Sequence, residues 1–589
     1  MRPLIASLLV CLAVPLAAQS ASNSWYVVHI GDSPVGWMHE TRADSAGAIR
    51  WNSTMYMALN RLGSQVVMET AVASVESRTG ALRALDVGTR MSEQRVNTSV
   101  TVNGRVASVS VAAGARRFDK TVDLPDTLLG REAAQRLTMT RLRAVGDSVR
   151  YASWDAQANA PATVTRIVTG RDSLLTIVER SSTSPLVTTM RLDAEGRAAI
   201  TQFDLPFGRV RVVLADSAIA MAASGGGSLA EESYTRTLVR TGIKLPRARD
   251  IDTLRVRLAL VDSAGRLPDL TGPGQRVVAR EGNAGTIEIA RRYPRGRATF
   301  PVAATTAIRE YLEPNAYVQS DEPRLVALAK RVVGTERDLF TAALALERWV
   351  ADSMHFDLGV AFAPSVEVFE RRRGTCVAYA TLLATLTRAV GIPSRIAMGY
   401  VYVNGIFGGH AWTEVLVGED WIPIDAAIVA RGPADAARFA FAWSSMADGP
   451  GSLTSGPALE LYGRLRATVE SFTVAGSRRD VPRDAKPYVI EGDRYLNEWL
   501  GMEVTKPAGF RFVELDETWP SKTIVGMERG TERVRVLLSL RAPWERDATR
   551  PDMISAGLDA WRLEVDSPNP QAPLSEVRRG LRLRDAGSP

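Results

Sequence analysis

Three residues between Gly374 and Asp425 have side chains that can do chemistry together: Cys376, His410 and Asp425. A thiol becomes a nucleophile when a neighbouring base takes its proton, and that base needs a partner to fix its tautomer. A cysteine, a histidine and an aspartate supply these three roles. The sequence therefore predicts a thiol nucleophile at Cys376, with His410 as its base and Asp425 as the orienting carboxylate.

Cysteine usage favours the same interpretation. The chain has two cysteines, and Cys11 lies in an apolar run near the N-terminus. If that segment is removed as a signal peptide, Cys376 is the remaining thiol and no intramolecular disulfide can form. A small buried core residue is the plainer reading of a lone cysteine. Its place at a predicted helix start, ahead of Gly-His-Ala-Trp, favours a nucleophile.

A largely buried helix is predicted from Cys376 to Val390, because its apolar residues recur at spacings of three and four. Thr375 is positioned to cap its start, and Gly391 followed by Pro393 would end it. A cysteine in the first turn lies at the positive end of the helix dipole, which lowers the pKa of its thiol.

Three segments rich in β-branched and aromatic residues follow this helix, at 394–403, 410–417 and 420–425. This composition is typical of strands, and a two-residue loop at 418–419 would join the last two as a hairpin. Val417 would then face Asp420 across the hairpin.

The hairpin register decides whether the three residues can meet. One face carries His410, Trp412, Glu414 and Asp425, and the other, which we expect to be the core face, carries Ala411, Thr413, Val415, Val417, Ile422 and Ile424. His410 and Asp425 are then diagonal neighbours, with Cβ atoms roughly 7–8 Å apart or less. We expect the Cys376 sulfur within about 4 Å of one ring nitrogen of His410, and an Asp425 oxygen near the other.

These motifs resemble the transglutaminase-like superfamily of papain-type folds. The matches, in order, are Gly374-x-Cys376 with Tyr379-Ala380, Gly391-Ile-Pro-x-Arg395, His410-Ala-Trp-x-Glu-Val415, and Trp421-x-Pro-x-Asp425. The resemblance covers roughly residues 321–429 and implies a thiol active site of Cys376, His410 and Asp425 that acts on amide or peptide-like bonds. The family often has an acidic residue two positions after the nucleophile, where this chain has Ala378.

Stabilising the oxyanion of such a reaction needs hydrogen-bond donors. The backbone N–H at the start of the predicted helix is one expected donor. Tyr379, Trp349 and Trp412 are candidate side chains for an oxyanion or substrate contact. The sequence shows no paired Cys/His ligand spacing and no phosphate-binding glycine loop, so neither a metal nor a cofactor is expected.

The N-terminus has the pattern of a signal peptide. Arg2 precedes an apolar run from Leu4 to Leu16 and then small residues, with cleavage expected between Ala18 and Ala21. The run is too short to span a bilayer comfortably, and no other stretch is long and apolar enough for a membrane helix. We therefore expect a periplasmic or secreted protein. A lipoprotein is disfavoured because Val10 precedes Cys11, where a small residue is wanted.

Charge and length bound the partners and the organisation. The net charge of +7 on 589 residues comes from arginines interleaved with acids, without a basic stripe, so nucleic-acid binding is not expected. A protein or peptide substrate, conceivably from the cell envelope, fits better. So long a chain predicts several domains.

The expected fold class is α+β: a transglutaminase-like (papain-type) core with a large N-terminal antiparallel β domain and small β and α/β flanking modules. The N-terminal domain is predicted as one curved sheet or half-barrel with a helix against it. The expected segments are a signal peptide at 1–20, an antiparallel β-rich domain at 23–222, a linker at 223–245, a small β module at 246–311, the catalytic core at 312–432, a helical connector at 433–486, a small α/β module at 487–545 and a partly disordered tail at 546–589.

Three functions are compatible with these features. The first is an exported thiol enzyme that cleaves or transfers amide bonds through a Cys-His-Asp triad and a thioester. The second is a binding or scaffolding protein that retains the fold without turnover, although such a protein has no use for an oxidisable thiol. The third is a distinct thiol acyltransferase of the same architecture, which would need an acyl-donor pocket.

An alkylation experiment separates a nucleophile from a core cysteine. Iodoacetamide should modify Cys376 in the folded protein well below pH about 8.5, the usual pKa of a free thiol. The labelled cysteine is identified by mass spectrometry. Labelling that occurs only after unfolding would show a buried structural cysteine and remove the enzyme hypothesis.

Overall fold

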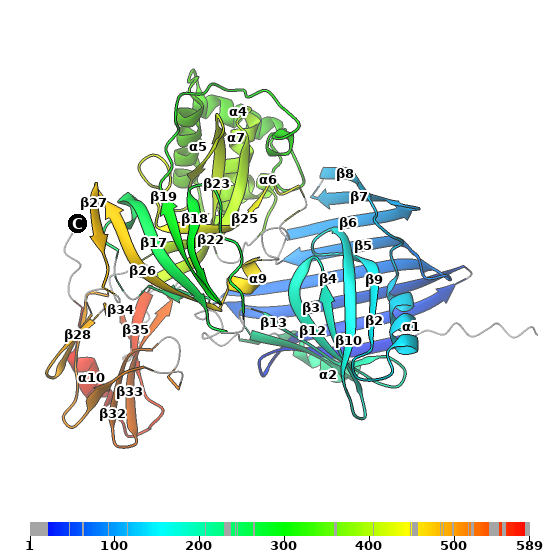
Figure 1. Ribbon diagram of the computed structural model, residues 1–589, viewed down its shortest axis with the longest axis horizontal. Coiled ribbons are helices and arrows are strands. Elements are labelled where there is room, and N and C mark those ends of the chain that lie inside the picture. The colour runs from blue at the N-terminus through cyan, green and yellow to red at the C-terminus, as the bar shows by residue number, and fades with distance from the viewer. Residues whose placement is uncertain are drawn as a thin grey trace, which may run out of the picture.

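The computed structural model describes residues 22–583 with short gaps, of which the longest are 229–236, 450–456, 541–552 and 556–560. The expected signal peptide therefore lies outside the described residues. In Figure 1 the large N-terminal sheet lies on the right, the helix-bearing domain predicted as the catalytic core at the top, the small central sheet to the left and the C-terminal β module at the bottom left. Among the described residues, no helix has the length and apolarity that crossing a membrane requires.

The N-terminal strands β1–β14 form one antiparallel sheet in which nearly every strand pairs with its chain neighbour, in the order β8-β7-β6-β5-β4-β3-β2-β1-β14-β13-β12-β11-β10-β9. Their bounds are Ser22–Ile30, Ser33–Ser45, Ala48–Arg61, Ser64–Ser77, Leu82–Met91, Gln94–Asn103, Val106–Ala113, Arg116–Asp123, Ser148–Asp155, Ala160–Arg171, Leu175–Ser181, Ser184–Leu192, Ala198–Leu205 and Gly208–Ala215. The sheet curves strongly (Figure 1). A large curved antiparallel sheet is what the sequence predicted here.

Helix α1 (Arg131–Arg141) packs against this sheet, as expected for residues 128–142. The buried Glu76 of β4 accepts hydrogen bonds from the N–H groups of Glu132 and Ala133, so a strand carboxylate caps the helix. A second short helix, α2 (Ser217–Ala222), packs on β1 and β2.

The described part of the expected linker at 223–245 is not free of structure. A 3₁₀ turn at Ala223–Gly225 leads to β15 (Gly227–Ser228), which pairs with β3. Strand β16 (Val239–Arg240) then joins the edge of the catalytic sheet at β23. The serine-glycine composition suggested a flexible link, but pairing with strands far away in the sequence orders these short pieces.

The described part of the core has four helices, α4 (Pro323–Val333), α5 (Leu339–Ser353), α6 (Ser365–Arg371) and α7 (Cys376–Ala389), of which α7 is the helix predicted from Cys376. Asp338 itself caps α5, because its carboxylate accepts from the Thr341 N–H. Helix α7 is buried along nearly its whole length, as its apolar periodicity indicated. Leucines of α4, α5 and α7 form one apolar cluster with Val415, Ile422 and Ile424 of the sheet.

The catalytic sheet has the order β16-β23-β22-β25, with β24 on the other side of β23. Its strands β22 (Ser394–Val403), β23 (Ile406–Val417) and β24 (Asp420–Ile424) match the three predicted segments. Val417 faces Asp420, which is the register expected from a two-residue turn. The expectation of a single core face is wrong, because His410, Trp412 and Glu414 on the opposite face are also buried.

The predicted helical connector at 433–486 is mostly strand. It forms β25 (Arg438–Ser444), the short helix α9 (Pro457–Leu461), β26 (Leu465–Val474) and β27 (Ser477–Asp480). β25 pairs with β22, and β26 pairs with β17. Both segments were expected as helices, and sheet partners that are remote in sequence override their local helical character.

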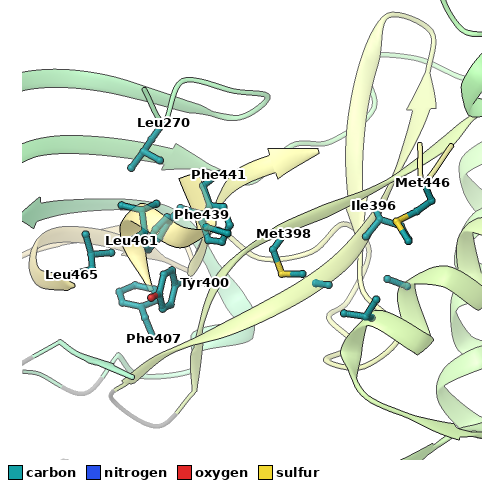
Figure 2. Packing of buried hydrophobic residues seen from close by; sticks show 14 of the residues in the cluster. Leu270, Ile396, Met398, Tyr400, Phe407, Phe439, Phe441, Met446, Leu461 and Leu465 are labelled. Atoms are coloured by element: carbon teal, nitrogen blue, oxygen red, sulfur yellow. The ribbon is translucent and has the colours of Figure 1, made fainter. Parts of the chain in front are cut away.

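The small central sheet therefore draws on both sides of the catalytic core. Its order is β18-β19-β17-β26-β27, with β17 at Ile251–Leu260, β18 at Gln275–Glu281 and β19 at Ala284–Ala290. Figure 2 shows how an aromatic and aliphatic cluster joins it to the catalytic sheet, with Tyr400, Phe407, Phe439 and Phe441 packed near Leu461 and Leu465. The β module at 246–311 is thus half of a sheet that residues 465–480 complete.

The C-terminal module is a pair of sheets, not an α/β unit ending at residue 545 with a disordered tail. One sheet has the order β28-β29-β30-β36 and the other β31-β32-β33-β35-β34. The bounds are Tyr488–Glu491, Arg494–Asn497, Met502–Thr505, Arg511–Val513, Thr523–Arg529, Glu532–Leu540, Met553–Ser555, Trp561–Asp566 and Leu581–Leu583 for β28–β36, and Leu574–Gly580 for helix α10. The tail is ordered there because Leu563, Val577 and Leu581 are buried in the module's core.

Gly399 of β22 is a point where the sheet admits no side chain. It pairs with His410, and a Cβ built on it would lie 1.9 Å from the Phe439 carbonyl oxygen of β25. Gly399→Ala should lower the free energy of unfolding by about 1–3 kcal/mol, since the added methyl group must push backbone aside. Gly296→Ala is the matched control, because a Cβ there meets nothing within 4 Å. Equal stability of the two variants in urea denaturation would contradict the close approach of β22 and β25.

Candidate active site

Cys376 is the first residue of helix α7 and is half-buried, while the residues that follow it in the helix are buried. Thr375 is the N-cap residue by its extended backbone, although its side chain makes no capping hydrogen bond to the helix. The thiol therefore lies at the open N-terminal end of a helix, where the dipole favours a negative charge. Its partial exposure leaves it accessible to a substrate.

His410 lies on β23 and its Nε2 is 2.8 Å from Oδ2 of Asp425, which directly follows β24. Both side chains are almost fully buried. The hairpin register that places Val417 opposite Asp420 carries these two residues to the same end of the hairpin. Because Asp425 occupies Nε2, the other ring nitrogen, Nδ1, is left for the thiol.

The Cys376 sulfur is within hydrogen-bonding reach of the His410 ring and of the Ala411 backbone N–H. Burial alone would raise the pKa of the Cys376 thiol, but the charge and hydrogen bond of His410 and the Ala411 N–H lower it below its usual value. Burial likewise would lower the pKa of His410, yet the charges of Asp425 and Cys376 raise it to about 9. Both directions favour the thiolate–imidazolium form of the pair over its neutral form.

The Asp425 carboxylate is held by a full set of donors. Oδ1 accepts from the backbone N–H groups of Ala427 and Ile428, at 3.0 and 3.1 Å. Oδ2 accepts from His410 and from Nη1 of Arg438, the latter at 2.6 Å. Burial raises the pKa of Asp425, but the charges of His410 and Arg438 and their hydrogen bonds leave it well below its usual range.

Arg438 extends this cluster away from the thiol. Its Nη2 donates to Asp435 at 2.8 Å, and Asp435 accepts in turn from Nη1 of Arg249 at 2.8 Å. Arg438 and Asp435 are buried, at 3% and 0% side-chain exposure. None of the three residues Arg438, Asp435 and Arg249 was predicted from the sequence. The alternation of Phe439, Phe441 and Trp443 with alanines was the available signal that Arg438 lies on a strand.

Glu347 of α5 is a second carboxyl against Asp425. Its Oε1 accepts the Asp425 backbone N–H at 2.6 Å, and the residue is 3% exposed. Burial raises the pKa of Glu347 to about 8, with the nearby Asp425 charge adding to the increase and the Asp425 N–H opposing it. The carboxyl is therefore neutral at pH 7. No sequence motif marks Glu347, which lies on the buried face of helix α5.

The three other predicted site residues have different surroundings. Trp412 is buried beside His410, with ring centroids 6.2 Å apart, and its Nε1 has no hydrogen-bond partner in the described part of the chain. Trp349 lies under the guanidinium of Arg372, 4.5 Å from its ring centroid. Tyr379 is buried in the helical core on α7. Trp412 is the one of these three that the structure brings against the His410 ring.

No group of three or more His, Cys, Asp or Glu side chains among the described residues is placed to hold a metal ion. The groups that the structure brings together at this site are the Cys376 thiol, the His410 imidazole and the charged side chains around them. This arrangement can generate a nucleophile and move one proton.

The match to a known family covers this site. Residues 326–426 match the family model of the transglutaminase-like superfamily, a range that includes Cys376, His410 and Asp425. The chain therefore contains a transglutaminase-like domain, as the four motifs indicated.

The matches to individual proteins cover different shares of this chain. An uncharacterised protein from Mycobacterium leprae is 27% identical over 122 residues, which are 19% of this chain and 43% of that protein. The match thus spans less than half the length of this curated relative. A solved structure of a candidate cysteine protease from Cytophaga hutchinsonii aligns with 41% of this chain and 91% of its own, at 18% identity and a TM-score of 0.26.

A β-barrel-like protein of unknown function from Brucella abortus aligns with 33% of this chain and 95% of its own, at 9% identity and a TM-score of 0.26.

The buried carboxyl of Glu347 predicts a pH-dependent stability. The native state keeps a proton up to pH about 8, whereas the unfolded chain releases it near 4.5. The free energy of unfolding should therefore fall as pH rises between these values, by up to about 1.4 kcal/mol per pH unit from this group. Glu347→Gln removes this dependence, so urea denaturation from pH 5 to 8 should show the variant gaining stability relative to the wild type.

Asp352→Asn provides the control for this experiment. Asp352 lies on the same helix, with its side chain 63% exposed. If the stability difference between Glu347→Gln and wild type is the same at pH 5 and pH 8, the carboxyl is not held neutral in the native state.

Proposed function

We propose that this protein is a thiol enzyme that cleaves or transfers amide or peptide bonds through Cys376, His410 and Asp425. One observation carries the proposal: His410 bridges a helix-start thiol and a buried carboxylate, with Nε2 2.8 Å from Asp425. This is the constellation that turns a thiol into a nucleophile. The family match to residues 326–426 supports the same class of chemistry.

In the proposed mechanism the Cys376 thiolate attacks the carbonyl carbon of the amide. The carbonyl oxygen becomes an oxyanion, which the backbone N–H at the start of α7 is placed to stabilise. His410, as imidazolium, gives its proton to the leaving nitrogen, and an amine departs as the thioester forms. Asp425 holds the imidazole in position and stabilises its charged form.

The second half of the reaction regenerates the thiol. Water or another amine attacks the thioester, and His410 takes the proton of the attacking group. The carbon–sulfur bond then breaks, and the acyl group leaves as a carboxylic acid or as a new amide. Hydrolysis and transfer thus share the same residues and differ in which acceptor reaches the thioester.

We further propose that the enzyme works outside the cytoplasm on a protein or peptide substrate. The basis is the signal-like sequence of residues 1–20, with Arg2 followed by an apolar run. The surrounding N-terminal, central and C-terminal sheets offer surface for a polymeric substrate.

Substitutions at the three residues test the mechanism. The purified protein is incubated with a peptide library of defined sequences and a labelled amine, and mass spectrometry detects new termini and new amides. Cys376→Ala and His410→Ala should abolish turnover. Asp425→Asn should reduce kcat by about 10–10³-fold, less than the roughly 10⁴-fold seen in a serine triad, because the thiol pKa is already lowered.

Glu419→Gln, at the exposed turn of the same hairpin, is the matched control and should keep full activity. Full activity of Asp425→Asn would mean that Asp425 only ends a strand. Turnover by Cys376→Ala would show that the activity does not use the thiol, and binding of peptides without any turnover by the wild type would favour a scaffolding protein.

A further inference from the structure

We propose that Arg438 is a positioning residue that keeps the Asp425 carboxylate ionised and aimed at His410. Asp435 and Arg249 hold Arg438 in place for this task. The inference rests on the proposed thiol mechanism and adds residues that lie outside the range 326–426 matched by the family.

The geometry starts at a single oxygen. Oδ2 of Asp425 receives both His410 Nε2, at 2.8 Å, and Arg438 Nη1, at 2.6 Å. When an imidazole and a guanidinium share one carboxylate oxygen, the more rigid donor sets the orientation of the carboxylate. Arg438 is that donor, because its side chain is 3% exposed and its second nitrogen is bound to Asp435.

Arg438 also separates two buried carboxylates. Asp425 and Asp435 are 1% and 0% exposed in their side chains, and each binds a different nitrogen of the same guanidinium. Two carboxylates in one dry site cannot both stay ionised without a cation between them, so one would take up a proton. A protonated Asp425 would no longer stabilise the imidazolium form of His410, and the reactive thiolate would be lost with it.

The contacts at the Asp435 end of the cluster hold the Arg438 side chain in position. Asp435 Oδ2 accepts from Arg438 and from Arg249, each at 2.8 Å. Arg249 also donates to the Tyr402 carbonyl oxygen, which ties it to β22. The aromatic face of Trp412 lies against Arg438, with its centroid 5.4 Å from Cζ. Arg438 is therefore held at its two terminal nitrogens by Asp425 and Asp435 and at its face by the Trp412 ring.

The groups that face Asp425 come from four packed elements and one loop. They are His410 on β23, Arg438 on β25, Glu347 on α5, Cys376 at the start of α7, and, through Arg438, Asp435 of the loop before β25. Arg438 is the permanent cation in direct contact with both aspartates, while Arg249 contacts Asp435. Removing Arg438 leaves Asp425 with the imidazolium as its cationic hydrogen-bond partner and Asp435 with Arg249.

The test uses the pH dependence of Cys376 alkylation by iodoacetamide in the folded full-length protein, with Cys376 followed by mass spectrometry. Arg438→Met keeps the length of the side chain and removes its charge. The midpoint of the alkylation profile should rise by about one pH unit or more relative to the wild type, since loss of an adjacent arginine raises a carboxylate pKa by about 1–3 units. Thermal denaturation is measured in parallel.

Arg395→Met is the matched control for losing a buried arginine. Arg395 lies on β22 and pairs with Glu414 at 2.6 Å, with side-chain exposures of 12% and 4%, but it makes no contact with the triad. This variant should lose stability without a shift of the alkylation midpoint. A stability loss in Arg438→Met with an unchanged midpoint would overturn the inference and leave Arg438 as a structural residue.

Arg438→Lys keeps the inference falsifiable if Arg438→Met does not fold, and a double variant adds a second test if it does. Arg438→Lys keeps a cation but cannot grip both carboxylates, so its midpoint should shift in the same direction by a smaller amount. The double variant Arg438→Met with Asp435→Asn removes the second carboxylate and should recover part of the shift. An unchanged midpoint in Arg438→Lys overturns the inference, as does a double variant no different from Arg438→Met. A wild-type midpoint near that of a free thiol would instead overturn the thiol mechanism itself.

Discussion

The catalytic core depends on one buried carboxylate. Asp425 is removed from water, and an ionised carboxylate in such a place is stable only when each of its oxygens is hydrogen-bonded and its charge is balanced. Three different parts of the fold meet this requirement: the Ala427–Ile428 backbone, β23 through His410, and β25 through Arg438. Helix α5 contributes Glu347, which accepts the backbone N–H of the same residue. The packing of helices α5 and α7 on this sheet places these elements around a single side chain.

The neighbouring carboxyls of Asp425 and Glu347 differ in charge because their surroundings shift their pKa values in opposite directions. Asp425 has cationic partners, and its pKa is depressed well below its usual range. Glu347 has no such partner at hydrogen-bonding distance, and its pKa rises to about 8 because burial dominates. A charged and a neutral carboxyl therefore lie side by side, and this arrangement avoids placing two negative charges next to the thiolate.

The sequence predicted those features of the site that residues close to one another in the sequence form. Periodicity gave helix α7, strand composition and a two-residue turn gave the hairpin, and their register brought His410 to Asp425. These features depend on residues close in sequence. The partners Arg438 and Arg249 depend on strands that pair across the molecule, and a single sequence carries little information on such pairing. The same limit explains why β26 was predicted as a helix, and why the described strands and helix at 553–555, 561–566 and 574–583 were not predicted within a tail expected to be partly disordered.

The topology of the central sheet also determines when, during synthesis of the chain, the site can be completed. β17 precedes the catalytic core and β26 follows it, and the hydrogen bond between Thr253 and Thr473 joins residues 220 positions apart. A chain that emerges from its N-terminus cannot complete this sheet, or bring Arg249 and Arg438 together around Asp435, until the residues after the core have been made. Cys376 is thus synthesised well before the charge cluster around Asp425 can close. Until the last strands have docked, the growing chain carries this thiol without the arginines that surround Asp425 in the folded protein.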